Sequence, residues 1–301
     1  MSGIERYLPR AWLGLLFSAA VAMSGCGGGG SGDATPANKL PTANARLGGE
    51  AVVNALTVFD TSGTTDSDGT IASRSWTYGD GQSGTADNHM YASAGSFTAT
   101  YTVTDDRGGA AGSSVVVSVA KCSSAGTAAS VLSPHTTVCV QTSRGEMVFE
   151  VYPAQAPITS ANFLKHVDEG FLAGTLFHRV IPGFVIQGGG FLPGMVAKAA
   201  TSAPIALESN NGLKNWQYTL AMARTNVPDS ATSQFFINAG DNHALDYNAA
   251  NATPNGYAVF GQVIFGTGVV DAISTVTTGT VSGFADVPVQ DVVIRGIVRL
   301  P

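Results

Sequence analysis

The sequence predicts a mainly β protein built from two domains, and three observations support this prediction. The chain has 301 residues, which is enough for two domains at ~100 to 200 residues each. It contains 37 glycines, and only 12% of its residues are charged, about half of the usual ~25%. Short segments in which apolar and polar residues alternate are separated by turn residues, which is typical of turn-dense β domains.

The composition also excludes some classes of protein and partner. Apolar residues make up 44% of the chain, so a disordered protein is not expected. Acidic residues outnumber basic ones by 21 to 15, the net charge is −6, and lysine and arginine form no cluster. A nucleic acid is therefore not an expected partner, because phosphate backbones are bound by basic patches.

The first 25 residues are expected to be an export signal. Arg6 and Arg10 precede an apolar run over residues 11–23, which has the length of a signal-peptide core and is too short to span a bilayer comfortably. Small residues then precede Cys26, with Met23 where leucine is usual. This arrangement resembles the lipobox of bacterial lipoproteins and implies that Cys26 is lipidated. The alternative is a simple secretory cleavage that leaves Cys26 free.

Residues 26–40 are expected to tether the protein to a membrane. The run 27–32 is glycine apart from Ser31, so it behaves as a flexible linker. Acyl chains on Cys26 would provide an anchor at ~0.8 kcal/mol per buried methylene. Gly27 follows the cysteine in place of aspartate, which in lipoproteins is compatible with the outer membrane. The expected location is the bacterial cell envelope, with the protein lipid-anchored in the outer membrane and facing the periplasm.

The two remaining cysteines, Cys122 and Cys139, are expected to form a disulfide. Disulfides persist in exported proteins, and closing a loop of this size contributes about 3 kcal/mol in the chain-entropy description. The alternative is two buried thiols. A mass measurement before and after reduction would distinguish the two states.

Residues 41–120 are expected to form a β-sandwich. Alternation is clear over residues 96–103 and 114–119, and glycine-containing turns separate the strands. Further residues resemble, in order, the signature of PKD domains, which have an immunoglobulin-like sandwich fold. They are residues 66–71, 76–81, 89–91, 95–97 and 103–105. The resemblance covers nearly all of this segment and implies a spacer or adhesion module.

Acidic residues of this first domain permit two interpretations. Asp66, Asp68 and Asp80 stand near glycines, as calcium ligands often do. An EF-hand loop counted from Asp66 needs glutamate at its twelfth position, where the chain has Thr77. We therefore expect no metal, and we expect the aspartates to fix turns around a core that contains Trp76.

Residues 121–135 are small, polar and interrupted by proline, so they are expected to link the sandwich to a second domain over residues 136–301. In that domain, residues 138–151 have the pattern of a β-hairpin, with apolar residues on both sides of a turn that contains Gly145. The chemistry of the protein is expected in this second domain.

Two helices are expected among the strands of the second domain. Thr159 can cap a helix that has one apolar face and ends near Gly170. Residues 269–276 carry a second apolar stripe after Gly266. Two helices among short strands predict a closed β-barrel with a helix at each end.

Four blocks of the second domain are similar, in order and spacing, to the cyclophilins, which are peptidyl-prolyl cis-trans isomerases. They are residues 177–190, 220–225, 233–238 and 257–261. The similarity spans the whole domain, is greatest to the bacterial periplasmic type, and implies a closed eight-stranded barrel. It also implies an isomerase that assists the folding of exported proteins, with X-Pro-containing polypeptides as partners.

The chemistry of such a site follows from the peptide bond itself. Rotation about that bond meets a barrier of ~18 to 20 kcal/mol, because the nitrogen lone pair is delocalised into the carbonyl. In a twisted X-Pro bond the nitrogen becomes pyramidal and can accept a hydrogen bond. A catalyst needs an apolar pocket for the proline ring and a fixed donor beside the imide nitrogen. No metal or cofactor is expected, and arginine suits the donor role because it stays protonated.

The resemblance assigns a role to each candidate site residue. Arg179 is the donor and Gln187 orients it or contacts the substrate backbone. The pocket for the proline ring is lined by Phe184, Val185, Phe236 and Leu245, with the hydroxyl of Tyr257 at its rim. The peptide on either side is held by Gln234 and by the backbone of Ala223 and Arg224. The side chain of Arg224 is expected to be exposed.

Several other polar residues are expected to have no catalytic role. His178 precedes the candidate arginine, but isomerisation transfers no proton, so we interpret it as structural. His243 and Asp246 are close in sequence, which usually indicates a solvated loop. Glu208 and Asp229 have no evident partner in the sequence.

Two departures from the cyclophilin pattern affect ligand binding. Val185 replaces the usual methionine of the pocket, and Ala244 stands where cyclophilins that bind cyclosporin tightly have tryptophan. Weak cyclosporin binding is therefore expected. The alternative function is a surface-tethered binding or adhesion protein that recognises proline peptides without useful turnover. A binder could dispense with Arg179, which this chain retains.

Overall fold

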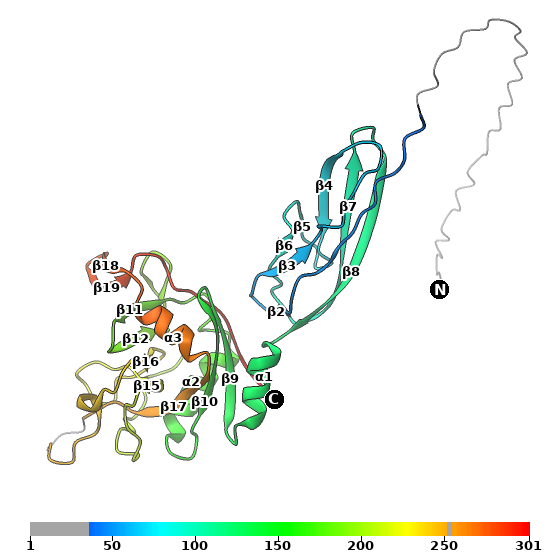
Figure 1. Ribbon diagram of the computed structural model, residues 1–301. Helices are drawn as coiled ribbons and strands as arrows, with labels where there is room; N and C mark the ends of the chain where they lie inside the picture. Colours follow the sequence, from blue (N-terminus) through cyan, green and yellow to red (C-terminus); the bar gives the residue numbers. More distant parts are fainter. Residues whose placement is uncertain (1–35, 252–254) are drawn as a thin grey trace, which may run out of the picture. The chain divides into compact units, whose positions relative to one another are not determined.

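The computed structural model describes residues 36–251 and 255–301 (Figure 1). The expected signal peptide, Cys26 and most of the tether lie outside the described residues. Within the described part, none of the helices has both the length and the apolar character that crossing a membrane requires.

The first domain is a β-sandwich, as the sequence predicts. One sheet has three strands in the order β1-β3-β6 and the other has five in the order β2-β8-β7-β4-β5. The strands are β1 (Arg46–Leu47), β2 (Ala51–Val52), β3 (Thr57–Asp60), β4 (Ile71–Thr77), β5 (Ser83–Gly84), β6 (Asn88–His89), β7 (Gly95–Asp105) and β8 (Ala110–Ala120). The long hairpin of β7 and β8 dominates the larger sheet (Figure 1).

Aromatic rings fill the sandwich around Trp76. The indole stacks on Phe59 with ring centroids 4.4 Å apart, and its Nε1 donates to Asp87 at 2.9 Å, so its polar atom is satisfied inside the core. Two of the aspartates near the glycines bind the backbone of their own turns, because Asp66 accepts from Asp68 N at 3.2 Å and Asp80 accepts from Gln82 N at 3.1 Å. This fits their interpretation as turn residues.

The second domain is built on an eight-stranded sheet in the order β11-β12-β16-β15-β17-β10-β9-β20. A bridge between Leu176 and Val293 joins its two edges and closes the barrel. The strands are β9 (Thr136–Thr142), β10 (Gly145–Val151), β11 (Phe177–Ile181), β12 (Val185–Gly188), β15 (Thr219–Met222), β16 (Phe235–Asn238), β17 (Val259–Phe265) and β20 (Ile294–Arg299). Two small hairpins accompany the barrel: β13 (Phe191–Leu192) with β14 (Val196–Ala197), and β18 (Thr278–Val281) with β19 (Phe284–Pro288).

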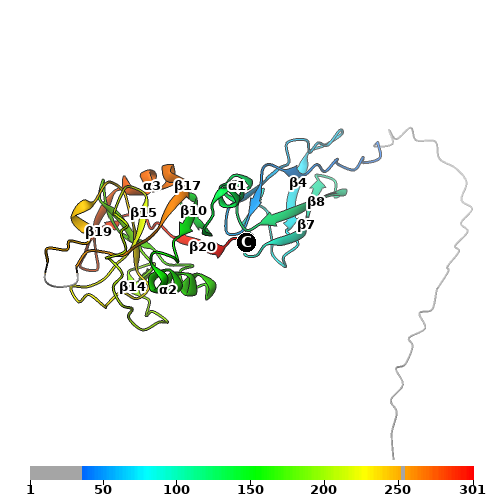
Figure 2. The same cartoon turned by 90° about the horizontal axis from the view of Figure 1, so that it is seen from below.

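The two expected helices are confirmed as α2 (Pro157–Asp168) and α3 (Thr267–Ser274). Figure 2 shows them on opposite sides of the strands. Each packs an apolar stripe on the barrel core, where the ring of Phe163 from α2 lies 5.4 Å from Phe235 and 5.0 Å from Phe260 between ring centroids. The core therefore joins both helices to the strands.

The N-terminus of α2 differs from the prediction. Thr159 does not cap it, because the helix begins two residues earlier, at Pro157, and proline suits the first helical turn. The free N–H groups of Ile158 and Thr159 instead donate to the Glu208 carboxylate at 3.0 and 2.8 Å. Glu208, for which the sequence indicated no partner, thus caps α2 from a distant loop.

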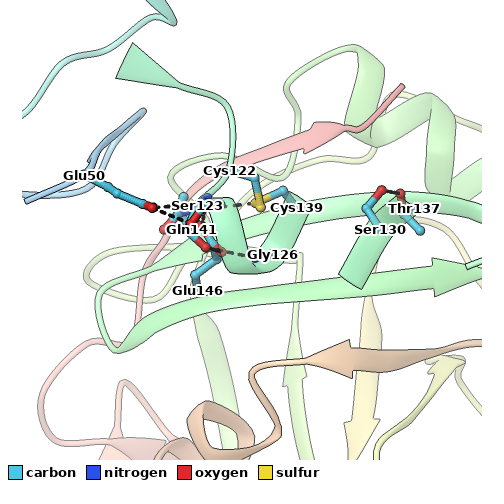
Figure 3. The surroundings of a disulfide bond; sticks show 10 residues. Glu50, Cys122, Ser123, Gly126, Ser130, Thr137, Cys139, Gln141 and Glu146 are labelled. Carbon is cyan, nitrogen blue, oxygen red and sulfur yellow. Dashed lines mark hydrogen bonds between the residues drawn. A yellow bond between two sulfur atoms is a disulfide. The ribbon is translucent and has the colours of Figure 1, made fainter. Parts of the chain in front are cut away.

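The segment 121–135, expected as a linker, instead contains a helix, α1 (Ser124–Leu132), that is fastened to the barrel. The disulfide between Cys122 and Cys139 is present, with Cα atoms 6.0 Å apart (Figure 3). Ser123 caps the helix by accepting from Gly126 N at 3.0 Å, and its own N–H donates to Glu146 at 2.9 Å.

An apolar cluster outside the barrel explains why this helix forms there. The disulfide packs with Val148, Leu300 and neighbouring residues of β17 and β20, and α1 lies against β9, β10 and β17. The sequence did not indicate this helix because a short run of serine and alanine has little apolar periodicity of its own.

Candidate active site

A cavity of about 240 Å³ opens at one side of the barrel, where β11, β12 and β16 meet the loops that precede β17. The structure brings together here every substrate-contact and donor residue expected from the sequence except Gln234, which lines the adjoining hollow. The lining residues are Arg179, Phe184, Val185, Gln187, Ala223, Arg224, Phe236, Leu245 and Tyr257.

The floor of this cavity is apolar. Val185 and Phe236 are buried and belong to one cluster that also contains Ala221 and Val259. The ring of Tyr257 meets Phe236 edge-on, with centroids 5.5 Å apart. A proline ring placed on this floor would leave water on contact with the aromatic and branched side chains, which is the main source of affinity for an apolar group.

One wall of the cavity is polar. Arg179 and Gln187 face each other across the β11–β12 ladder. The Gln187 amide donates to Gln234 Oε1 at 2.9 Å, so Gln187 is fixed by the residue that lines the adjoining hollow. A Cβ atom on Gly190 would lie 2.5 Å from the Gln234 side chain, so glycine at this position leaves room for the amide pair.

The described residues that line this cavity include no histidine, cysteine, aspartate or glutamate. General acid-base catalysis most often uses histidine or a carboxylate, and the described lining contains neither. The lining offers an apolar slot with fixed hydrogen-bond donors on one side. That arrangement suits a reaction in which bonds rotate and no proton is transferred.

The profile of the family described as "Cyclophilin type peptidyl-prolyl cis-trans isomerase/CLD" matches residues 137–299. The chain belongs to the cyclophilins. A second profile, that of the PKD domain, matches residues 38–119, which confirms the resemblance of the first domain. The cyclophilin domain and the PKD domain together account for most of the chain.

Individual relatives match over the cyclophilin domain. Peptidyl-prolyl cis-trans isomerase cyp18 from Streptomyces antibioticus is 56% identical over 161 residues, covering 53% of this chain and 95% of the relative. Peptidyl-prolyl cis-trans isomerase B from Escherichia coli is 50% identical over 160 residues, covering 53% and 97%. A crystal structure of a Cryptosporidium parvum cyclophilin in the presence of the dipeptide Ala-Pro has a TM-score of 0.47 at 26% identity, covering 55% of this chain and 99% of that one.

In the cyclophilin domain, Phe184 is held at the slot by a buried polar network that the sequence analysis missed. The Phe184 carbonyl accepts from Asn242 Nδ2 at 2.7 Å and from Ala239 N at 2.8 Å. Asn242 also donates to Asn238 at 2.7 Å, and Asn238 donates to Asn215 at 3.2 Å. Asn238 and Asn242 lie four residues apart, but Asn215 comes from another segment, so only the fold reveals that the three asparagines act together.

Arg224 is not the exposed side chain that the sequence analysis expected. It is half-buried, its Nε donates to the Gly256 carbonyl at 2.9 Å, and its guanidinium lies 4.8 Å from the ring centroid of Tyr257. This cation–π contact supports Tyr257 at the rim of the cyclophilin slot. The Arg224 side chain therefore acts on the site through its neighbours.

The remaining polar residues have structural partners. Burial lowers the pKa of His178 to about 4, so this side chain is neutral at neutral pH and packs on Phe191. Burial tends to raise the pKa of Asp246, but hydrogen bonds from the Asn215 backbone and side chain outweigh it and lower that pKa. Asp246 thus organises its loop instead of being solvated. Asp229 accepts from Leu207 N at 2.9 Å.

Proposed function

We propose that the cyclophilin domain catalyses cis-trans isomerisation of X-Pro bonds with Arg179 as the hydrogen-bond donor to the imide nitrogen. The observation that carries this proposal is the pairing, in one open cavity, of a guanidinium on the polar wall with an apolar floor built on Phe236 and Val185. The apolar floor can bind the proline ring, and the guanidinium can donate a hydrogen bond beside it. These are the two requirements of the reaction.

The proposed catalysis is a preference for the twisted bond over either planar form. As the X-Pro bond rotates, its nitrogen regains a lone pair, and an Arg179 N–H donates to that lone pair only in the twisted state. An interaction that is stronger in the transition state than in the ground state lowers the barrier. The proline ring is held in place by Phe184, Phe236 and Leu245. Rotation about the X-Pro bond therefore moves the carbonyl group that precedes the proline.

The test of this function is a protease-free assay in which the interconversion of an Ala-Pro tetrapeptide is followed directly. The full mature chain is expected to accelerate an exchange that otherwise takes tens of seconds. The alternative function, a surface protein that binds proline peptides without turnover, predicts measurable peptide binding and no acceleration. Binding without acceleration would therefore overturn the proposal.

We also propose that the protein is exported, lipid-anchored through Cys26 in the outer membrane and active on exported chains in the periplasm. Support comes from the signal-like residues 1–25 and from the Cys122–Cys139 disulfide, since disulfides persist in oxidising compartments. Cells supplied with a labelled fatty acid are expected to incorporate the label into the wild-type protein and not into the Cys26→Ser variant. Equal labelling of both proteins, or labelling of neither, would contradict the anchor.

Cyclosporin is expected to bind weakly. Ala244 is exposed in the short helix η1 (His243–Leu245), next to Leu245 of the slot, and it offers neither an indole N–H donor nor a large ring for packing. Calorimetry is expected to give a micromolar or larger dissociation constant for the wild type and a smaller one for Ala244→Trp. A submicromolar constant for the wild type would contradict this prediction.

A further inference from the structure

Arg179 lies beside the carboxylate of Asp286. The Nε atom of Arg179 lies 3.7 Å from Oδ2 of Asp286, and the two side chains are 40% and 42% exposed. Across residues 36–251 and 255–301, Arg179 makes no other ion pair. The motif that carries Arg179 does not include Asp286, which comes from the β18–β19 hairpin much later in the chain.

An irregularity in that hairpin presents the carboxylate. Gly279 is opposite Val287 and Val281 is opposite Phe284, so one residue of β18 stands opposite two residues of β19, Ala285 and Asp286. This is a β-bulge, a feature that re-aims side chains and is common next to active sites. Asp286 has a φ of 61°, in the left-handed region that costs free energy for a residue other than glycine.

The residues on both sides of the bulge are packed against the rest of the domain. Val287, the next residue along, is buried in a small apolar cluster with Leu176 and Met195. The strand β19 lies beside β11, which carries Arg179. The ring of Phe284 also packs on Phe191, with centroids 5.1 Å apart. Packing on both sides of Asp286 therefore holds the strained residue in place.

Stability alone does not account for this arrangement. A half-exposed ion pair contributes little to folding, and a left-handed backbone costs some free energy even for aspartate, which adopts it more readily than most residues. A free arginine side chain has many rotamers, and a carboxylate on its Nε edge restricts them while leaving the terminal nitrogens free to donate. Strain next to a reacting group is characteristic of preorganised sites.

We propose that Asp286 is a positioning residue for the isomerisation, holding the Arg179 guanidinium with its terminal N–H groups toward the slot. This inference rests on the proposed role of Arg179. The Asp286 carboxylate touches no substrate and acts only through the arginine. Its contribution is to keep the donor where the twisted imide nitrogen will be, without a search among rotamers during each turnover.

The first test compares two variants of equal charge change in the full chain. Asp286→Asn keeps the size of the side chain and tolerates the left-handed backbone, and Asp291→Asn removes an exposed carboxylate of the following loop. Asp286→Asn is expected to lower kcat about tenfold, with KM and the melting temperature unchanged. Asp291→Asn is expected to match the wild type. An unchanged kcat for Asp286→Asn would overturn the inference.

The second test is a double-mutant cycle with Arg179→Ala. If Asp286 acts through the arginine, adding Asp286→Asn to Arg179→Ala causes no further loss, whereas an independent structural role predicts that the two losses multiply. The cycle also separates the positioning role of Asp286 from the donor role of Arg179. Loss with Arg179→Ala but none with Asp286→Asn rejects only the positioning role, and no loss with Arg179→Ala rejects the proposed mechanism itself.

A spectroscopic readout completes the test. The Nε–H resonance of Arg179, assigned by its absence in Arg179→Ala, is expected to shift in Asp286→Asn and to stay in place in Asp291→Asn. A resonance that does not move when the carboxylate is removed would show that the two groups do not interact in solution, and it would contradict the positioning role.

Discussion

Replacing Arg179 by alanine is expected to lower kcat/KM on a proline tetrapeptide by roughly a hundred- to thousandfold, the usual cost of removing one donor from a transition state. The reason is that the slot still accepts the proline ring on its apolar floor, while the twisted nitrogen finds no hydrogen-bond donor. The fold should be unaffected, because the Arg179 side chain is partly exposed and its ion pair with Asp286 is a half-exposed contact. A protease-free assay and a melting curve measure the two effects.

The matched control for this prediction is Arg295→Ala. Arg295 is an exposed arginine of β20 that does not line the slot, so its removal changes the net charge by the same amount. Activity is expected to stay within about twofold of the wild type, as for most surface changes away from a site. If both variants lost activity equally, the effect would be one of charge, and the donor role of Arg179 would be contradicted.

Removing the disulfide is expected to give the largest change in stability. The double variant Cys122→Ser with Cys139→Ser should lose about 3 kcal/mol of unfolding free energy, because the closed loop no longer restricts the unfolded chain. The loop spans a sequence separation of 17 residues, and it ties α1 to β9. Loss of the bond also exposes the apolar cluster formed by Val148 and Leu300. Urea unfolding measures the change.

Isomerase activity should survive the loss of the disulfide at temperatures where the double variant stays folded. The disulfide and its apolar cluster share no residue with the cluster that forms the slot floor. The control is the wild-type protein after chemical reduction, which should show the same loss of stability as the double variant. A double variant as stable as the wild type would show that α1 is held by its packing and by the hydrogen bond from Ser123 to Glu146, without a contribution from the disulfide.

The parts of the site that lie within continuous motifs could be predicted from the sequence. Arg179, Phe184 and Gln187 come from one block, and Phe236 comes from another block that pairs with it as a neighbouring strand. The hairpin pattern over residues 138–151 located β9 and β10, and apolar stripes located the helices α2 and α3, whereas the other strands of the barrel were expected from the cyclophilin resemblance. These features are local, so residue type and spacing were enough to predict them.

The parts that the sequence did not indicate depend on contacts between distant segments. Asp286 reaches Arg179 from a bulge in which its backbone is left-handed, and the ion pair joins segments far apart in the sequence. Glu208 caps α2 from a loop, and a run rich in serine and alanine becomes α1 because a disulfide and Glu146 hold it. In each case tertiary contacts, and not local propensity, decide the outcome.

NMR exchange on one Ala-Pro peptide can measure both the affinity of the peptide and its rate of interconversion while bound. Arg179→Ala is expected to bind the peptide about as tightly as the wild type, because the apolar floor is intact, while interconversion on the protein falls nearly to the uncatalysed rate. A variant that binds poorly but interconverts bound peptide at the wild-type rate would show that Arg179 serves binding and does not stabilise the twisted state.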